Sequence, residues 1–243
     1  MSQQLPFLAR HHRREPHTDA LGDRLNWLRA GVLGANDGLV STAGVVVGVA
    51  GATTTLSTIL TAGLAALVAG SLSMAGGEYV SVSTQRDTEA AAIDLERWEL
   101  ANLPQQEEAE LAGIYRDRGL SEQLSHQVAR ELTAGNVLRA HAEAELQIDP
   151  DALTSPWMAA GASFVSFAIG GALPVLAILV PFSDWRVAVC VVAAVIGLVL
   201  TGYLSARLGK APPRAAVLRN VGFGIVTMAI TWGVGKLSGG VIG

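Results

Sequence analysis

Apolar stretches of about 20 residues recur along the chain, and a helix of that length crosses the hydrocarbon core of a bilayer. The predicted spans are 31–50, 56–82, 156–180, 187–206 and 215–235. In the third span, Pro174 follows a pair of glycines, Gly170 and Gly171, and this pattern predicts a kink. The fold class predicted is therefore an all-α membrane protein with five transmembrane helices.

A polar segment with a helical pattern separates the second span from the third. Pro104 suits the first turn of a helix, while Gly119 followed by Ser121 indicates a helix end and a new N-cap. Three helices are predicted in this segment: 84–101, continuous with the second span, 104–118 and 121–147. The predicted domains are an N-terminal tail (1–29), transmembrane helices one and two (30–85), a cytoplasmic helical insertion (86–151) and transmembrane helices three to five (152–243).

Charge divides the chain in the same way. Residues 86–151 contain 15 Asp and Glu against 6 Arg, a net charge of −9, and the rest of the chain has a net charge of +5. An acidic domain argues against a nucleic-acid partner and favours cations. Basic residues concentrate in the N-terminal tail and in the loop at 207–214, so both should be cytoplasmic, with the C-terminus outside. The Arg- and Ala-rich composition favours a bacterial inner membrane.

Small residues dominate the apolar stretches. The chain is 50% hydrophobic with only 5% aromatic residues, and it contains 27 glycines, which suits helices that approach closely in a bilayer. The single cysteine, Cys190, excludes a disulfide within the chain and is expected to be a small buried hydrophobic residue.

One acid interrupts the first span, which reads LGANDGLVSTAGVVVGV from residue 33. An Asp at the centre of a membrane helix costs roughly 2.5–3.5 kcal/mol. Asp37 is therefore either a water-facing acid near a helix end or a buried ligand or proton site. The glycines around it let another backbone come close. These glycines are Gly34, Gly38, Gly44 and Gly48.

The second span contributes two more candidate ligands, in the sequence GSLSMAGGEYVSVSTQRDTEA. Met74 and Glu78 are four residues apart and share a helix face. A thioether added to carboxylates moves the preference of a site from Mg²⁺ or Ca²⁺ towards first-row transition metals such as Fe²⁺. Together with Asp37 they predict a metal site in the membrane. The alternatives are that Met74 serves packing and that Glu78 reaches the interface.

The acidic segment contains pairs of glutamates that share helix faces on either side of the turn at 102–104. An antiparallel hairpin would bring both pairs together, and a histidine and a glutamate four residues apart on the third helix could join them. The predicted set is Glu96, Glu99, Glu107, Glu110, His141 and Glu145. These residues predict a multi-metal site, and the alternative is a solvated charged face.

These motifs resemble the vacuolar iron transporter family of divalent-metal/proton exchangers. The resemblance rests on the two span motifs above, on LERWELANLPQQEEAELAGIYRDRGL and on HAEAELQI. It implies a homodimer with a transport path between protomers, lined by Asp37, Met74 and Glu78. With this resemblance, the glycines around Asp37 are expected to give room to a second protomer and a passing ion. It also implies that the glutamates of the insertion bind metal ions. Part of the family has consecutive methionines where this chain has His141 and Ala142, and of these two only His141 can ligate.

The predicted function is export of Fe²⁺ from the cytoplasm in exchange for protons, with Mn²⁺, Co²⁺ and Zn²⁺ as further candidate ions. The transported ion is a substrate, so no cofactor and no enzymatic activity are expected. One alternative is a membrane-anchored ferritin-like ferroxidase. Di-iron bundles of that kind use Glu-x-x-His motifs, which the acidic segment lacks. Another alternative is a metal sensor or scaffold without transport.

Overall fold

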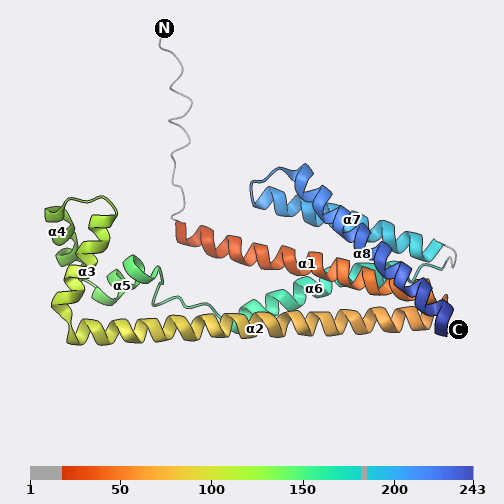
Figure 1. Cartoon of the computed structure of the whole chain (residues 1–243), viewed down its shortest axis with the longest axis horizontal. Helices are drawn as coiled ribbons and strands as arrows, with labels where there is room; N and C mark the ends of the chain where they lie inside the picture. Colours follow the sequence, from red (N-terminus) through yellow and green to blue (C-terminus); the bar gives the residue numbers. More distant parts are fainter. Residues whose placement is uncertain (1–17, 182–184, 243) are drawn as a thin grey trace, which may run out of the picture. The chain divides into compact units, whose positions relative to one another are not determined.

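The computed structural model describes residues 18–181 and 185–242, and within them every regular element is a helix (Figure 1). The all-α prediction is confirmed. The elements are α1 (Thr18–Ala52), α2 (Leu56–Asn102), α3 (Pro104–Asp117), α4 (Glu122–Thr133), α5 (Val137–His141), a π-helix η2 (Ala142–Leu146), α6 (Pro156–Ala177), α7 (Arg186–Leu208) and α8 (Pro213–Ile242). Helix α1 begins at Thr18, so the last part of the predicted tail at 1–29 is helical, and residues 1–17 lie outside the described part.

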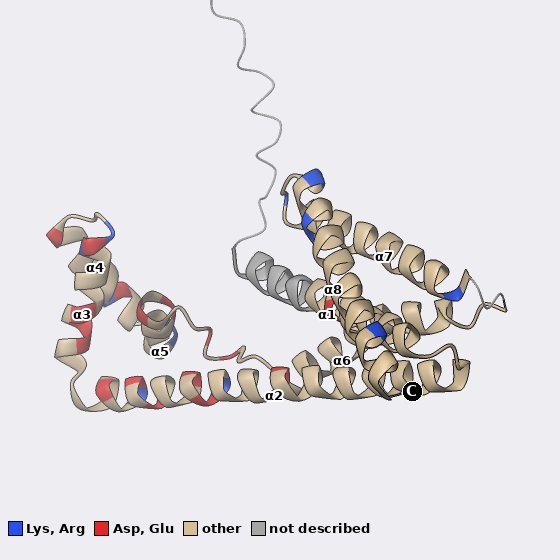
Figure 2. Ribbon diagram, turned by 45° about the vertical axis from the view of Figure 1, so that its right-hand side comes forward, with Lys and Arg blue, Asp and Glu red and all other residues tan. Residues whose placement is uncertain are grey.

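The chain forms two compact units. The apolar unit consists of the described residues up to Gly76 and from Ala159 onward, and the acidic unit is Gly77–Met158. Five of the described helices are long and apolar enough to cross a membrane, namely α1 from Gly31, α2, α6, α7 and α8. Helix α2 contributes its residues up to Gly76 to the apolar unit and its residues from Gly77 to the acidic unit. Its last part carries the Asp and Glu residues (Figure 2).

Helix α1 is the packing centre of the apolar unit, and its glycines make this possible. Gly34 and Gly38 lie against α6, where a Cβ on Gly38 would overlap the carbonyl oxygen of Phe167. Gly44 and Gly48 lie against Thr227 and Thr231 of α8. These glycines therefore serve contacts within one chain, and the expectation that they leave room for a second protomer is wrong.

The interior beside these contacts is small and apolar. Val46 and Val47 of α1 pack with Ile178 and Cys190 in one buried cluster. Cys190 is a free thiol with no exposed surface, as predicted. Helix α6 runs through Pro174, whose carbonyl oxygen lies 3.6 Å from the Cys190 sulfur.

The acidic unit has its own small core, formed by Leu111, Ala112, Ala129 and Ala144 from α3, α4 and η2. The chain reverses between α3 and α4 at Gly119, whose φ of 101° favours glycine. Ser121 then caps α4 by accepting a hydrogen bond from the Leu124 backbone N–H, as the sequence predicts.

The single helix predicted over 121–147 is wrong, because the structure breaks it. Helix α4 ends at Thr133, and the Asn136 side chain accepts a hydrogen bond from the Arg139 backbone N–H to begin α5. After His141 the backbone widens into the π-helix η2, which ends at Gln147 in the left-handed region (φ 57°). Gly135 and Asn136 are turn-forming residues, so the break has a recognisable local cause.

The closest approach of α1 to α8 yields a stability prediction. A Cβ on Gly235 would overlap the carbonyl oxygen of Gly48, whereas a Cβ on Gly233 would meet nothing within 4 Å. Gly235→Ala should lower the melting temperature of the detergent-solubilised protein by roughly 5 °C, since overpacking costs about 1–3 kcal/mol. Gly233→Ala is the matched control and should be neutral or slightly stabilising. Equal melting temperatures for the two variants would contradict this packing.

Candidate metal sites

Three elements of the acidic unit place ligands in one buried cluster. Glu96 comes from the charged end of α2, Glu107 from the first turn of α3 and His141 from the last turn of α5. Helix α3 starts at Pro104 immediately after α2, and the Leu103 N–H donates to the Glu99 carbonyl across this turn. The tight reversal brings the two glutamates together.

The ligand atoms of these three side chains all lie within 4.8 Å of one another. Nδ1 of His141 lies 3.0 Å from Oε1 of Glu96 and 3.7 Å from Oε2 of Glu107. Two ligands about 2.1 Å from one ion are roughly 3.0–3.5 Å apart when adjacent, so these separations suit a shared first-row transition-metal ion. The exposed fractions are 2% for Glu96, 5% for Glu107 and 0% for His141.

The cluster is not held together by hydrogen bonds. Within the described part of the chain, neither ring nitrogen of His141 has a hydrogen-bond partner, and neither does Oε1 of Glu96. The 3.0 Å approach of Nδ1 to Oε1 does not meet hydrogen-bond geometry. Buried polar atoms are nearly always paired, so unpaired atoms in one place indicate that a ligand completes them. A divalent cation would accept electron pairs from the imidazole and both carboxylates.

Electrostatics supports the same conclusion. Burial, together with the charges of Glu145, Glu107, Glu99 and Glu110, raises the pKa of Glu96 from 4.5 to about 7. Burial and neighbouring glutamates also raise the pKa of Glu107. Burial lowers the pKa of His141, so the imidazole is neutral near pH 7 and can ligate a metal ion.

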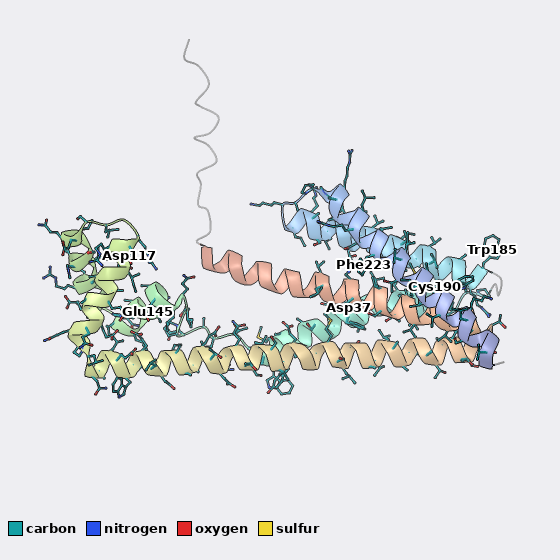
Figure 3. The ribbon with its side chains drawn as sticks, in the orientation of Figure 1. Asp37, Asp117, Glu145, Trp185, Cys190 and Phe223 are labelled. Atoms are coloured by element: carbon teal, nitrogen blue, oxygen red, sulfur yellow. The ribbon has the colours of Figure 1, made fainter. Side chains whose placement is uncertain are left out.

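The other predicted ligands border the cluster. Glu99 is half-buried, and Glu110 and Glu145 are exposed (Glu145 is labelled in Figure 3). Burial raises the pKa of Glu145, and the charges of Glu110 and Glu99 raise it further. The predicted six residues therefore form one electrostatic group, in which three are buried together and three supply surrounding negative charge.

Sequence reasoning missed the support behind His141. The Arg118 guanidinium donates a 2.5 Å hydrogen bond to the Ala144 carbonyl inside η2. A π-helical turn frees backbone groups from α-helical pairing and is frequent beside functional sites. Ala142, which stands where part of the resembling family has a methionine, is fully buried and contributes packing only. No short sequence signal marks a single π-turn.

The apolar unit contains a second candidate site, a pocket of about 440 Å³ formed by α1, α2 and α8. Asp37 and Met74, two of the predicted membrane ligands, both line it. The remaining lining residues are Leu33, Asn36, Val40, Arg219, Asn220 and Phe223. Figure 3 marks Asp37 on α1 and Phe223 on α8. The third predicted ligand, Glu78, is half-buried one turn after Met74 and is not part of this lining.

Asp37 lies on the exposed side of α1. Its Oδ1 accepts a 2.8 Å hydrogen bond from the Ser41 hydroxyl. Leu33, Asp37, Ser41 and Val45 are all exposed at intervals of four residues, so they form one stripe along the helix. The neighbouring Gly38 is buried against α6, which fixes the side of α1 on which Asp37 emerges.

Three polar residues of the pocket were not predicted as site residues. Asn36 accepts a long 3.5 Å hydrogen bond from the Thr201 hydroxyl of α7. Asn220 lies beside Gly202 of α7. Arg219 is exposed on α8. Its position near the start of the helix predicts a side chain that extends to the membrane–water interface. Asn36 precedes Asp37 on α1, whereas only the packing of α8 against α1 brings Arg219 and Asn220 into the same pocket lining.

Comparison with known proteins extends over both units. The profile of the VIT family matches residues 28–236. A protein of Acanthamoeba castellanii named vacuolar iron transporter is 41% identical over 225 residues, covering 92% of this chain and 83% of that protein. Vacuolar iron transporter homolog 1 of Oryza sativa subsp. japonica is 40% identical over 218 residues, covering 89% of this chain and 75% of that protein. Vacuolar iron transporter homolog 3 of Arabidopsis thaliana is 37% identical over 217 residues, covering 89% and 85%.

The raised pKa of Glu96 predicts that metal binding releases protons. Below pH 7 this carboxyl is mostly protonated, and a metal ion must displace the proton. Calorimetric titration of the full chain with Mn²⁺ in buffers of different ionisation enthalpy should show about one proton released per ion at pH 6.5, falling towards zero at pH 8.5. The affinity for Mn²⁺ should weaken as the pH falls.

The raised pKa of Glu96 also contributes to the stability of the metal-free unit. This contribution is fully present below pH 4.5 and is lost as the pH rises through about 7.

Glu131 supplies the matched control, because it is exposed on α4 and accepts a hydrogen bond from Gln127 outside the cluster. Glu131→Gln should leave affinity and proton release unchanged, whereas Glu96→Gln should weaken binding at least about tenfold. Proton release that is independent of pH in the wild type would contradict the role given to Glu96.

Proposed function

Because this chain belongs to the VIT family, we propose that it transports divalent metal ions, Fe²⁺ foremost, across a membrane. The relatives are named iron transporters and not enzymes, in agreement with the sequence prediction. The observation that carries the proposal is the pocket in which Asp37 and Met74 meet among apolar helices. A carboxylate with a thioether favours first-row transition metals, so Mn²⁺, Co²⁺ and Zn²⁺ are further candidate substrates.

The proposed topology has five spans, with the acidic unit and the N-terminus in the cytoplasm and the C-terminus outside. The turn between α7 and α8 contains Lys210 and is flanked by Arg207 and Arg214, whereas the turn between α1 and α2 contains only threonines (Figure 2). This asymmetry supports the assignment by the positive-inside rule. Trp185 precedes the first residue of α7, where an aromatic residue suits the opposite interface. The bacterial inner membrane stays a prediction from composition.

In this proposal the acidic unit collects ions for export. The net charge of −9 on residues 86–151 raises the local cation concentration, and the buried cluster of Glu96, Glu107 and His141 binds an ion after partial dehydration. From there the ion passes to Asp37, Met74 and Glu78. Glu78 completes the membrane site in this scheme because it follows Met74 by one helical turn.

Proton exchange follows from the chemistry of carboxylates. A carboxylate without a metal ion in an apolar environment favours its protonated form, and a bound dication favours the ionised form. An acid in the membrane can therefore release a proton when metal arrives and take one up when metal leaves. Metal export and proton entry are coupled if the same carboxylate serves both.

The exposed stripe on α1 supports a homodimer. An acid facing lipid is costly, and Leu33, Asp37, Ser41 and Val45 leave Asp37 on the outer side of its own helix bundle. A second copy placed against this stripe would shield Asp37 and its ion from lipid. The transport path then runs between the protomers.

Flux through liposomes tests the transport proposal. The full chain, reconstituted in liposomes with an acidic interior, should take up Fe²⁺ under reducing conditions several-fold faster than without a pH gradient. Asp37→Asn should reduce uptake at least about tenfold, because it removes an anionic ligand. Asp117→Asn is the control, since Asp117 is exposed at the end of α3 (Figure 3), and it should retain full uptake.

The flux assay tests transport, proton coupling and the membrane site separately. Absence of flux in a folded wild-type sample that binds metal would favour a sensor. Flux that ignores the pH gradient would contradict proton coupling. Flux that survives Asp37→Asn would contradict the membrane site.

Cysteine cross-linking tests the dimer. Ser41→Cys and Val45→Cys lie on the exposed stripe, and Cys190 can stay in place because it is buried. A disulfide needs Cα atoms within about 7 Å, so mild oxidation in membranes should give a covalent dimer for at least one of these variants. Val192→Cys, exposed on α7, is the control and should stay monomeric. Cross-linking only at position 192 would place the interface elsewhere.

A further inference from the structure

The membrane pocket holds a fixed positive charge beside its carboxylate. Arg219 of α8 lines the same pocket as Asp37 of α1 and Met74 of α2. A guanidinium stays protonated at all physiological pH values, so this charge cannot be removed by titration. A metal ion that binds Asp37 in this pocket must do so in the presence of a second cation.

The two charges enter their helices at matching depth. Asp37 lies about six residues after Gly31, where the apolar part of α1 begins, and Arg219 lies about six residues after Pro213, where α8 begins. In the proposed topology both helices start at the cytoplasmic side. Both side chains therefore lie about 9 Å along their helices from that side.

The pair is open in this structure. Among the described residues, neither Asp37 nor Arg219 has an ion-pair partner within 4.0 Å, and Asp37 accepts its hydrogen bond from Ser41 instead. Arg219 is exposed, and its long side chain can change rotamer without moving α8. Nothing in the packing of the described helices holds the guanidinium in one position.

We propose that Arg219 is the internal counter-ion of Asp37, pairing with it when the pocket holds no metal ion and being displaced when a divalent ion binds. The inference rests on the proposed transport function and adds a residue to its mechanism. Arg219 is a positioning residue for Asp37 when no metal ion is bound, and it competes with the metal ion for the Asp37 carboxylate. It compensates the carboxylate while that group is ionised and free of metal, between metal release and proton uptake, in a medium where an unpaired charge is costly.

Competition of this kind serves turnover and selectivity. A site that binds an ion too tightly releases it slowly, and a tethered cation lowers the affinity of the site. A divalent ion gains about twice the Coulomb energy of a monovalent ion from the same carboxylate, so it displaces the guanidinium more readily. Arg219 thereby favours divalent over monovalent ions at Asp37.

Kinetics of Mn²⁺ uptake into liposomes by the full chain tests the proposal. Arg219→Gln should lower KM at least about threefold and lower kcat with it, because binding tightens and release slows. Arg219→Lys should restore both constants towards the wild type. Arg214→Gln is the matched control, since Arg214 is exposed on the first turn of the same helix outside the pocket lining, and it should leave both constants unchanged.

A double-mutant cycle in equilibrium Mn²⁺ binding separates coupling from a general change of fold. In the Glu96→Gln background, which weakens the cytoplasmic site, Arg219→Gln should tighten binding, and it should have no effect once Asp37→Asn is also present. An unchanged or raised KM for Arg219→Gln, or equal effects of Arg219→Gln and Arg214→Gln, would overturn the proposal. Absence of wild-type flux would instead overturn the transport function, because the binding cycle reports on Arg219 independently.

Discussion

A contact between two electron-pair donors governs the acidic unit. Oε1 of Glu96 and Nδ1 of His141 lie 3.0 Å apart, both buried, without a hydrogen bond between them. Such a contact is unfavourable until a proton or a metal ion lies between the donors. The turn at Pro104, the small core under η2 and the Arg118 hydrogen bond hold the donors in place. A cation between these donors would relieve the contact.

The same constraint acts on Asp37 with different partners. Its helix is fixed by Gly38 and Gly48 against α6 and α8, so the side chain cannot turn towards its own core. An acid on the outer side of an apolar helix requires compensation from outside that helix. Ser41, the guanidinium of Arg219 and, in the proposed dimer, a second protomer supply it at different stages.

Sequence periodicity predicted the features that depend on local chemistry. The helical class, the Ser121 cap and the pairing of glutamates across the turn at Pro104 all follow from spacing and residue type. The π-turn at η2 was missed because a helical pattern runs through it, whereas the break before α5 was missed although Gly135 and Asn136 are turn-forming residues. Arg219 was missed as a pocket residue for another reason: the approach of α8 to α1 places residues 182 positions apart in the lining of one pocket, and no window of sequence contains both.

The two candidate sites differ in how their arginines are placed. In the acidic unit, Arg97 pairs with Asp94, and Arg139 pairs with Glu143, Asp149 and Asp151. Neither guanidinium forms an ion pair with the buried cluster. The cluster is left with uncompensated donors and attracts an ion. In the apolar unit, the arginine lines the pocket itself and opposes retention of the ion. In the proposed transport scheme, binding is then strong where the ion is collected and weak where it must leave, as a carrier that turns over requires.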